Sequence, residues 1–342
     1  MKKKKFVALA LAFALSLSLV ACGNKPEDPE TPEDPATSGG SWPTGQVEIV
    51  VPAAAGGSQD VRARVVADYL QRKYGVTVVV NNMGEGNGVT GFEYVRNAKP
   101  DGSVLLYNYT GNIASMYHVG KYAHHPADAF TTIAQTEFWG GTVLVAPANS
   151  PYDTFADMVN DLKATGGSVT VGAQLGSLNQ SRLTVFAKNE GVNFEMVEAM
   201  TATDKVTAMA GGFVDMTFLP VATAAQYEES GDLKILGVTG VARDPLFPDY
   251  STIVEQGGYD LDLNGYSRVY APAGMDPELA AAINEAICGI QDDPTAVEGM
   301  KNLGSTFIDG ISLVDWETAV KLLEEDNQSV KVAVEAAGFL VQ

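Results

Sequence analysis

Short apolar, β-branched segments alternate with amphipathic segments along most of the chain. The apolar segments predict strands, and the segments between them repeat apolar residues every three or four positions, which is the spacing of one helix face. The predicted strands are Val47–Val51, Val76–Val80, Val104–Tyr107, Val143–Ala146, Val169–Val171, Phe194–Val197, Val214–Phe218 and Ile235–Thr239. The predicted helices are Ser58–Lys73, Thr154–Ala164, Ser177–Lys188, Ala222–Glu229, Asp276–Ile290, Pro294–Leu303 and Leu313–Ala337. This alternation predicts an α/β fold with parallel sheets, helices on both sheet faces and ligand sites beyond the carboxyl ends of the strands.

The first residues predict export and attachment to a membrane. Lysines precede a mostly apolar run, Phe6–Val20, which is shorter than the roughly 20 residues of a spanning helix, so residues 1–21 are predicted to be a signal peptide. The small residue before Cys22 resembles the lipobox of bacterial lipoproteins, which implies cleavage before Cys22 and acylation of that residue. We therefore expect the mature protein at the extracytoplasmic face of a bacterial cell membrane. An ordinary secretory signal is the alternative.

An acidic, Pro-rich segment at residues 22–41 has almost no apolar side chains and predicts an extended tether. The folded part begins near Trp42, and its length exceeds that of a typical single core, so two lobes are expected. No second linker follows, which indicates lobes joined by crossing strands rather than arranged in series.

The formal net charge of −20 makes nucleic acid and anionic lipid headgroups poor partners. Small anions remain suitable ligands, because main-chain dipoles in a cleft act at contact distance, whereas surface charges are screened over about 8–10 Å. Besides Cys22 the chain has one cysteine, Cys288, which lies among apolar residues at helical spacing and is predicted to be a core thiol.

The segment VVPAAAGGSQDVRAR, residues 50–64, passes from a strand through two glycines into a helix. The glycines permit a tight turn, and the unpartnered amides at the start of the helix carry the positive end of its dipole. Such an end suits a carboxylate or a phosphate. On this helix Asp60 and Arg64 are expected to form an ion pair, and Arg62 is expected to face solvent.

A second strand, glycine loop and helix unit spans residues 169–182. Gly176 gives the turn, Ser177 is a candidate N-cap or ligand donor, and Arg182 is expected to face solvent. Two such helix ends facing each other would clamp a molecule with two acidic groups. Helix capping without a ligand is the alternative at both glycine loops.

Polar residues elsewhere are further ligand candidates. Tyr109, Thr110 and Asn112 follow a predicted strand, where a tyrosine can wall a pocket while a threonine and an asparagine donate hydrogen bonds. Arg268 lies where the chain is expected to cross back between the lobes, and a guanidinium there would suit a bidentate contact with a carboxylate.

Several motifs in this order resemble the solute receptors of the tripartite tricarboxylate transporters, also known as Bug-type extracytoplasmic receptors. The motifs are VVPAAAGGSQDVRAR at residues 50–64, Asn82 with the loop Gly84–Gly91, Pro100–Gly102, Gly211–Asp215, Ala242–Pro245 with Phe247–Asp249 and Glu255–Gly257, and Ala271–Gly274. Each motif alone is modest, but their shared order over Trp42–Gln342 makes the resemblance specific.

The resemblance implies a periplasmic-binding-protein-like type II fold, a Venus flytrap of two doubly wound α/β lobes joined by two crossing strands and without catalysis. Lobe 1 is then residues 42–144 with 267–342, and lobe 2 is residues 145–266. The implied partners are a small-molecule carboxylate and the large and small membrane subunits of the cognate transporter. We expect a lipid-anchored monomer that binds no nucleic acid, cofactor or metal.

In that family, loops of both lobes hold the ligand's carboxylates largely through backbone amides and ordered waters. Carried over by position, these loops are Ala53–Ser58 in lobe 1 and Gln174–Gln180 and Ala199–Asp204 in lobe 2. The predicted ligand-binding residues are Ala53, Ala55, Gly56, Gly57, Ser58, Tyr109, Thr110, Asn112, Gln174, Gly176, Ser177, Thr201, Thr203 and Arg268.

This chain departs from the family pattern at two positions. An aromatic residue is usual at the position of Ala53, and a tyrosine followed by glycines is usual over Ala199–Asp204. Loss of these aromatic walls would enlarge the pocket or shift its polarity. Thr201 and Thr203 would add hydroxyl donors, whereas an inward-facing, ionised Asp204 would favour an amine-bearing ligand.

Two other classes of function compete with a transport receptor. An extracytoplasmic hydrolase would need a nucleophile or a metal, but His118, His124 and His125 match no spaced zinc set, and no Gly-x-Ser-x-Gly elbow is present. A lipoprotein that presents its ligand to a membrane sensor is excluded by no residue, so that alternative stays open.

Overall fold

The computed structural model describes residues 42–138, 141–244, 247–308 and 310–341. The predicted signal peptide, the predicted tether and the predicted lipidation site Cys22 lie outside these residues. Among the described residues, none of the helices is long and apolar enough to cross a membrane.

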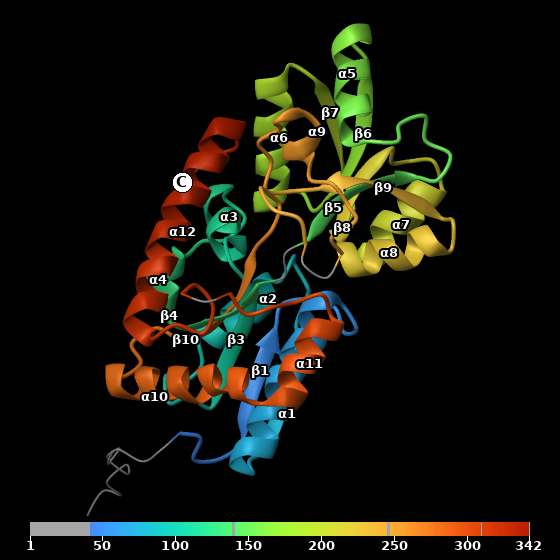
Figure 1. Ribbon diagram of the computed structural model, residues 1–342. Helices are drawn as coiled ribbons and strands as arrows, with labels where there is room; N and C mark the ends of the chain where they lie inside the picture. The colour runs from blue at the N-terminus through green and yellow to red at the C-terminus, as the bar shows by residue number, and fades with distance from the viewer. Residues whose placement is uncertain (1–41, 139–140, 245–246, 309, 342) are drawn as a thin grey trace, which may run out of the picture. The chain divides into compact units, whose positions relative to one another are not determined.

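Two five-stranded sheets organise the described chain (Figure 1). The first sheet has the order β2-β1-β3-β10-β4, with β1 at Val47–Val51, β2 at Val78–Asn82, β3 at Val104–Tyr109, β4 at Phe130–Phe138 and β10 at Tyr266–Pro272. The second has the order β7-β6-β8-β5-β9, with β5 at Thr142–Pro147, β6 at Ser168–Ala173, β7 at Asn193–Glu198, β8 at Met216–Pro220 and β9 at Leu233–Val238. The predicted α/β class with two lobes is confirmed, and each sheet with its helices is called lobe 1 or lobe 2 below.

Each sheet contains one strand that runs against its neighbours. Strand β10 is antiparallel to β3 and β4, and β5 is antiparallel to β8 and β9. These are the strands that the chain enters on passing from the other sheet, so no helical crossover ties them to a parallel neighbour. The sheets are therefore mixed: the predicted parallel pairing holds for β1 with β2 and β3 and for β6 with β7 and β8, and the antiparallel strands β10 and β5 are added to it. Because β5 begins at Thr142, a boundary after Leu144 would fall inside this strand.

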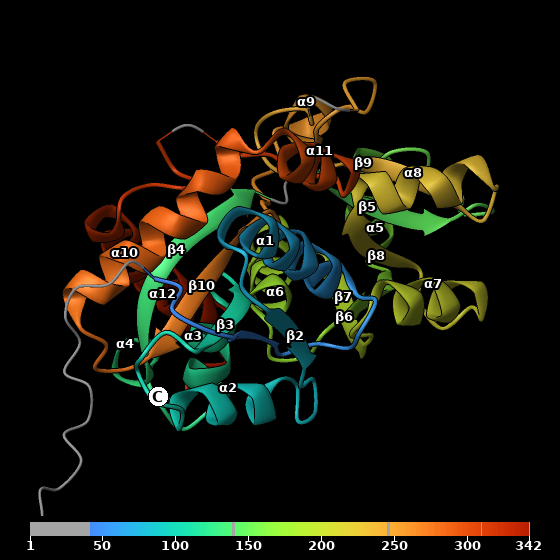
Figure 2. The same cartoon turned by 90° about the horizontal axis from the view of Figure 1, so that it is seen from below.

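Helices cover both faces of the first sheet (Figure 2). Helices α1 (Ser58–Tyr74), α10 (Pro277–Cys288) and α11 (Pro294–Asn302), with the short η1 (Gly289–Asp292), pack on one apolar face. Helices α2 (Val89–Arg96), α3 (Asn112–His118), α4 (Pro126–Ala129) and α12 (Trp316–Ala337) pack on the other. The buried side chains of β1 and β3 alternate between these two faces, which explains why both strands read as continuous apolar runs.

The second sheet is covered in the same way. Helices α5 (Phe155–Thr165), α6 (Leu178–Glu190) and α9 (Ile253–Gly257) pack on one face around Phe155 and Phe186. Helices α7 (Ala202–Ala210) and α8 (Val221–Glu229) pack on the other. The two lobes therefore repeat one plan, a mixed sheet between two helix layers.

Candidate functional site

In each sheet, two neighbouring parallel strands send their connections in opposite directions. In lobe 1 these strands are β1, which continues through α1 to β2, and β3, which continues toward β4; in lobe 2 they are β6 and β8. Ligands of open α/β sheets bind beyond the carboxyl ends of such strands. The candidate site is therefore formed by the loops that follow β1 and β3 in lobe 1 and β6 and β8 in lobe 2.

The loop after β1 turns at Gly56, whose φ is +78°, whereas Gly57 has a φ of −71°. The positive φ of the turn is therefore at position 56, where a glycine adopts it without strain, and not at position 57. The Gly56 N–H donates a 2.7 Å hydrogen bond to Oδ2 of Asp60. The other carboxylate oxygen of Asp60 lies 2.9 Å from Nη2 of Arg64, which confirms the predicted ion pair.

The carboxylate of Asp60 therefore already occupies part of the anion-binding end of α1. Asp60 is 2% exposed. Burial alone would raise its pKa, but hydrogen bonds from Arg64, the Gly56 N–H and Asn82 outweigh burial and hold the pKa below its ordinary value. Asp60 is thus a permanent anion at this helix end.

Ser58 and Tyr109 meet across the β1 and β3 ends, with 2.7 Å between their hydroxyl oxygens. Burial raises the pKa of Tyr109, so this hydroxyl stays protonated. Thr110 instead pairs with Tyr266 of β10, because its N–H donates to the Tyr266 carbonyl at 2.9 Å and its hydroxyl accepts from the Tyr266 N–H at 3.3 Å. Asn112 donates to Oδ1 of Asn108 at 3.2 Å.

Arg62 is buried beneath this edge, so the expectation that it faces solvent is wrong. Its guanidinium donates to Oγ of Ser305 at 2.6 Å and to the carbonyls of Ser58 and Leu303 at 2.9 and 3.0 Å. Arg62 therefore anchors the first turn of α1 to the segment after α11 and has its donors committed inside lobe 1. Arg182 is half-buried and donates to the carbonyl of Asn264 at 3.2 Å.

The loop after β6 repeats the plan of the loop after β1. Gly176 has a φ of +88°, and its N–H donates a 2.6 Å hydrogen bond to Oε1 of Gln180. Ser177 is the N-cap of α6 and accepts from the Gln180 N–H at 3.2 Å, while the Gln174 carbonyl accepts from the Ser177 N–H at 3.2 Å. The Gly176 carbonyl also accepts from the hydroxyl of Ser115 on α3 at 2.8 Å, which joins this loop to lobe 1.

The loop after β7 ends in a capping box at the start of α7. The Thr201 hydroxyl accepts from the Asp204 N–H at 3.0 Å, and the Asp204 carboxylate accepts from the Thr201 N–H at 2.9 Å. That backbone hydrogen bond holds the pKa of the exposed Asp204 below its ordinary value. Asp204 therefore serves the helix end, and Thr203 is exposed one residue before it.

Arg268 is 1% exposed, within lobe 1. Its Nη2 donates to Oε1 of Gln135 on β4 at 2.6 Å, and its Nη1 lies 3.5 Å from Oδ2 of Asp326 on α12. The side chain thus connects β10 to β4 and α12. The candidate contact of Arg268 with a ligand stays a prediction; in the structure its register partner on β3 is Asn108, next to Tyr109, and its guanidinium is directed to Gln135 and Asp326.

A cavity of about 430 Å³ lies against these loops. Its lining residues are Gly84, Gly86, Asn87, Met116, Lys121 and Met200. Gly84 packs directly on the backbone of Ala53, and Lys121 donates a 2.5 Å hydrogen bond to the carbonyl of Leu175. The cavity therefore adjoins the β1 loop through Gly84, the β6 loop through Lys121 and the β7 loop through Met200, and its volume suits a small organic molecule.

Sequence reasoning missed Lys121 and Met116 at this cavity. The β2–α2 loop was identified only as a family motif, although its three glycines, at positions 84, 86 and 88, were a local signal of close backbone packing. Lys121 gives no such signal, because it follows α3 in a segment without periodicity.

Several first-turn amides stay available at both helix ends. Among the described residues, no acceptor is hydrogen-bonded to the N–H groups of Ser58 and Gln59 at α1, or of Leu178 and Asn179 at α6. These amides are the donors that a ligand anion would meet.

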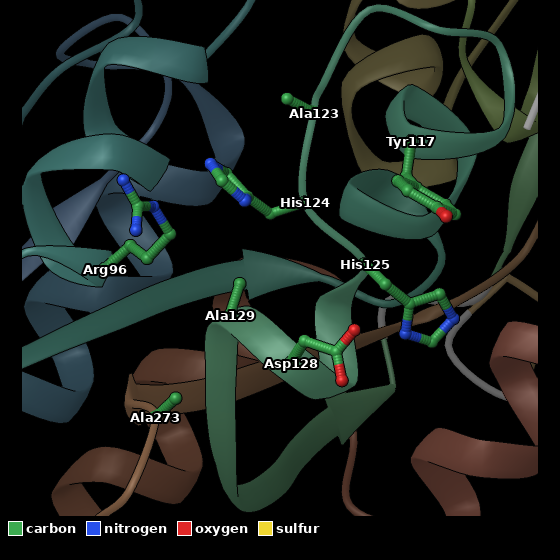
Figure 3. A pocket seen from close by; sticks show the side chains of 8 residues that line it. All are labelled: Arg96, Tyr117, Ala123, His124, His125, Asp128, Ala129 and Ala273. Atoms are coloured by element: carbon green, nitrogen blue, oxygen red, sulfur yellow. The ribbon is translucent and has the colours of Figure 1, made fainter.

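A second cavity, of about 300 Å³, lies elsewhere in lobe 1 and contains two histidines (Figure 3). Arg96 and His124 come from different segments in Figure 3. Both pair with the carboxylate of Glu93, at 2.7 and 3.5 Å. Asp128 adds a further negative charge to the lining. Carboxylates therefore balance the positive charge at this cavity. Among the described residues, no group of three side chains could hold a metal ion.

Cys288 packs against the core of lobe 1, and burial raises the pKa of its thiol to about 12. A thiol with so high a pKa is not a nucleophile near neutral pH, in agreement with the predicted core role.

Comparison with known families identifies the class of protein. The sequence profile of the tripartite tricarboxylate transporter family receptors matches residues 62–336. The chain belongs to this family. Its members are receptors and not enzymes, which confirms the prediction of a non-catalytic protein, and the receptor is extracytoplasmic.

Individual relatives of the receptor are distant. A UPF0065 protein of Agrobacterium vitis is 28% identical over 268 residues, which cover 78% of this chain and 77% of the relative. A Rhodopseudomonas palustris protein solved with adipate has a TM-score of 0.77 at 22% identity, over 87% of this chain and 98% of that one. MatC of the same organism, solved with malate, has a TM-score of 0.73 at 22% identity, over 86% of this chain and 100% of that one. These structures share the type II binding-protein fold with this chain.

Proposed function

We propose that the protein is a lipid-anchored receptor that captures a carboxylated small molecule and delivers it to the large and small membrane subunits of a tripartite tricarboxylate transporter. The observation that carries the proposal is a helix start with open first-turn amides at the switch point of each lobe, at α1 and at α6. Carboxylates bound by two proteins of the same fold support the ligand class.

In this proposal the ligand lies between the β1 and β6 loops and draws them together. Amides of Ser58 and Gln59 bind one acidic group, and amides of Leu178 and Asn179 bind the other. Ser58 and Tyr109 supply hydroxyl groups at the lobe 1 end. Closure removes water from the cavity, and the amide contacts strengthen as the local dielectric constant falls.

A thermal-shift panel tests the ligand class. Malate, adipate, citrate and phthalate are each added to the purified receptor, with the diamide of adipate as the neutral control. A ligand that binds only the folded state stabilises it by about 2.7 kcal/mol at a concentration of 100 times Kd. We expect at least one acid, and not the diamide, to raise the melting temperature. If none of the acids changes it, the proposed ligand class is wrong.

A fractionation experiment tests the anchor. Wild-type protein is expected in the membrane fraction with an acylated N-terminal Cys22, measured by mass spectrometry. Cys22→Ser cannot be acylated, so the mass of the acyl groups should be absent from this variant. Wild-type protein in which residue 22 carries no acyl group would contradict lipid anchoring while leaving the ligand class intact.

A further inference from the structure

We propose that Lys205 is the side chain that binds a carboxylate of the ligand and makes the receptor select a dianionic molecule over its monoamide. This proposal rests on the proposed function, because it names a charged contact within the same site.

Lys205 lies at the switch point of lobe 2. It is on the first turn of α7, 7% exposed, and its Nζ donates a 3.0 Å hydrogen bond to the carbonyl of Phe218. Strands β6 and β8 pair as far as Gly172 and Thr217, and Phe218 is the next residue. Helix α7 begins four residues after the carboxyl end of β7, and from its first turn the ammonium group reaches the middle of β8, whose five residues end at Pro220. It therefore lies two residues short of the carboxyl end of a strand beyond which ligands of such sheets bind.

Among the described residues of lobe 2, no carboxylate pairs with this group. Helix α7 packs against β5, β6 and β8, and none of these strands contains a charged residue. The one acid on its own helix, Asp204, is held in the capping box. The other close partner is the ring of Phe218, whose centroid is 3.3 Å from Nζ.

Burial without a counter-ion lowers the pKa of Lys205 to about 7. An ammonium has three donors, and the Phe218 carbonyl uses one of them. An incoming carboxylate would supply the missing charge and accept a charge-assisted hydrogen bond, which is roughly twice as strong as a neutral one. In a protein with a net charge of −20, a buried lysine without a counter-ion in lobe 2 is a feature that favours an anionic ligand.

Two single variants, each measured with two ligands, test the contact. Binding of the dicarboxylate that stabilises the wild-type receptor, and of its monoamide, is measured by calorimetry for wild type, Lys205→Met and the control Lys188→Met, an exposed lysine of α6. We expect Lys205→Met to bind the dicarboxylate about 10- to 100-fold more weakly, and to bind acid and monoamide equally. Lys188→Met should match wild type.

Proton uptake gives a second readout that requires no variant. Because the lysine is largely neutral at pH 8 when the site is empty, binding of the dicarboxylate should take up close to one proton, measured by calorimetry in phosphate and in Tris. Wild-type binding without proton uptake, or undiminished dicarboxylate affinity in Lys205→Met, would overturn the role of Lys205. Failure of every dicarboxylate to bind the wild type would instead count against the proposed function.

Discussion

The starts of α1 and α6 are built alike, but they differ in one charge. In each, a glycine with positive φ donates its N–H to the side chain four residues later, from Gly56 to Asp60 and from Gly176 to Gln180. At α1 the acceptor is an ionised carboxylate paired with Arg64, whereas at α6 it is a neutral amide. The acid at α1 is buried on the helix itself, whereas the acid nearest to the start of α6 is the exposed Glu198, which accepts from the Leu175 N–H at 3.2 Å. The positive end of the α1 dipole is therefore neutralised more directly than that of α6.

This difference teaches that the two lobes do not contribute equally to anion binding. The buried cations of lobe 1, Arg62 and Arg268, are directed to internal acceptors, and lobe 1 holds Asp60 at the helix end. Lobe 2 has a neutral acceptor, Gln180, at the α6 turn and a lysine without a counter-ion at α7. We therefore expect lobe 2 to hold the ligand's charge and lobe 1 to close over it through hydroxyl groups and amides.

Substitution of the two turn glycines should give the largest difference between the starts of α1 and α6, measured as loss of stability. A Cβ at Gly176 would lie 2.8 Å from Nζ of Lys121, whereas a Cβ at Gly56 would meet nothing within 4 Å. Both positions impose the left-handed cost of about 1–2 kcal/mol, so Gly56→Val should lose about that much and Gly176→Val about 3 kcal/mol. Urea denaturation measures both. Equal losses would mean that Lys121 moves aside at no cost.

Removal of the internal anion should destabilise lobe 1. Asp60→Asn is expected to lower the free energy of unfolding by roughly 1.5 kcal/mol at pH 7, because two charge-assisted hydrogen bonds are weakened. The control Asp68→Asn removes an exposed acid with the same spacing to Arg72 and should cost about 0.3–0.5 kcal/mol.

The pH dependence of that effect has a defined sign. Because the pKa of Asp60 is lowered on folding, its stabilisation is present above its ordinary value of 3.8 and is lost as the pH falls through the lowered value. Wild type should therefore lose its advantage over Asp60→Asn in acid, followed by denaturation between pH 7 and pH 2. A constant difference over this range would exclude an ionised Asp60.

The converse change should make α6 resemble α1. Gln180→Glu places a carboxylate beside the Gly176 amide, and we expect about a 10-fold loss of affinity for the acid that binds wild type, or about 1.4 kcal/mol. Asn189→Asp adds the same charge near the other end of α6 and serves as the control. Calorimetry compares the two, and an equal loss in both would point to overall charge instead of the helix end.

Substitution at the start of α7 should have the smallest effect on stability and none on ligand affinity, because the capping box already satisfies first-turn amides of this helix. Thr201→Ala should cost about 1 kcal/mol of stability, whereas Thr203→Ala, at the second residue of the helix, should be near neutral. Ligand affinity should stay unchanged in Thr201→Ala. A large loss of affinity there, measured by calorimetry, would return Thr201 to the set of ligand donors.

Sequence patterns predicted the lobes and the glycine loops because β1 and β3 are apolar on both faces, β6 and β8 carry buried apolar residues, and turn residues follow β1 and β6. They missed β4 and β10 for a physical reason. Strand β4 buries Gln135 and Glu137, and β10 buries Ser267 and Arg268, so polar side chains that satisfy one another conceal the period of a strand. The burial of charged side chains could not be predicted either, because neither the burial of Arg62 nor that of Lys205 follows from the local sequence pattern.

Because β10 lies between β3 and β4, lobe 1 cannot complete its sheet until the chain has been made as far as Pro272. All five strands of lobe 2 precede that point. If the chain emerges from a secretion pore with its N-terminus first, the sheet of lobe 2 can therefore be completed before the sheet of lobe 1. Until β10 arrives, β3 and β4 each present an unpaired edge, the kind of edge that invites pairing with another chain. The lobes are therefore completed in the reverse of the order in which they begin along the chain. Once lobe 2 has folded, it brings its two ends closer together, so β10 has a shorter distance to cover before it pairs with β3 and β4.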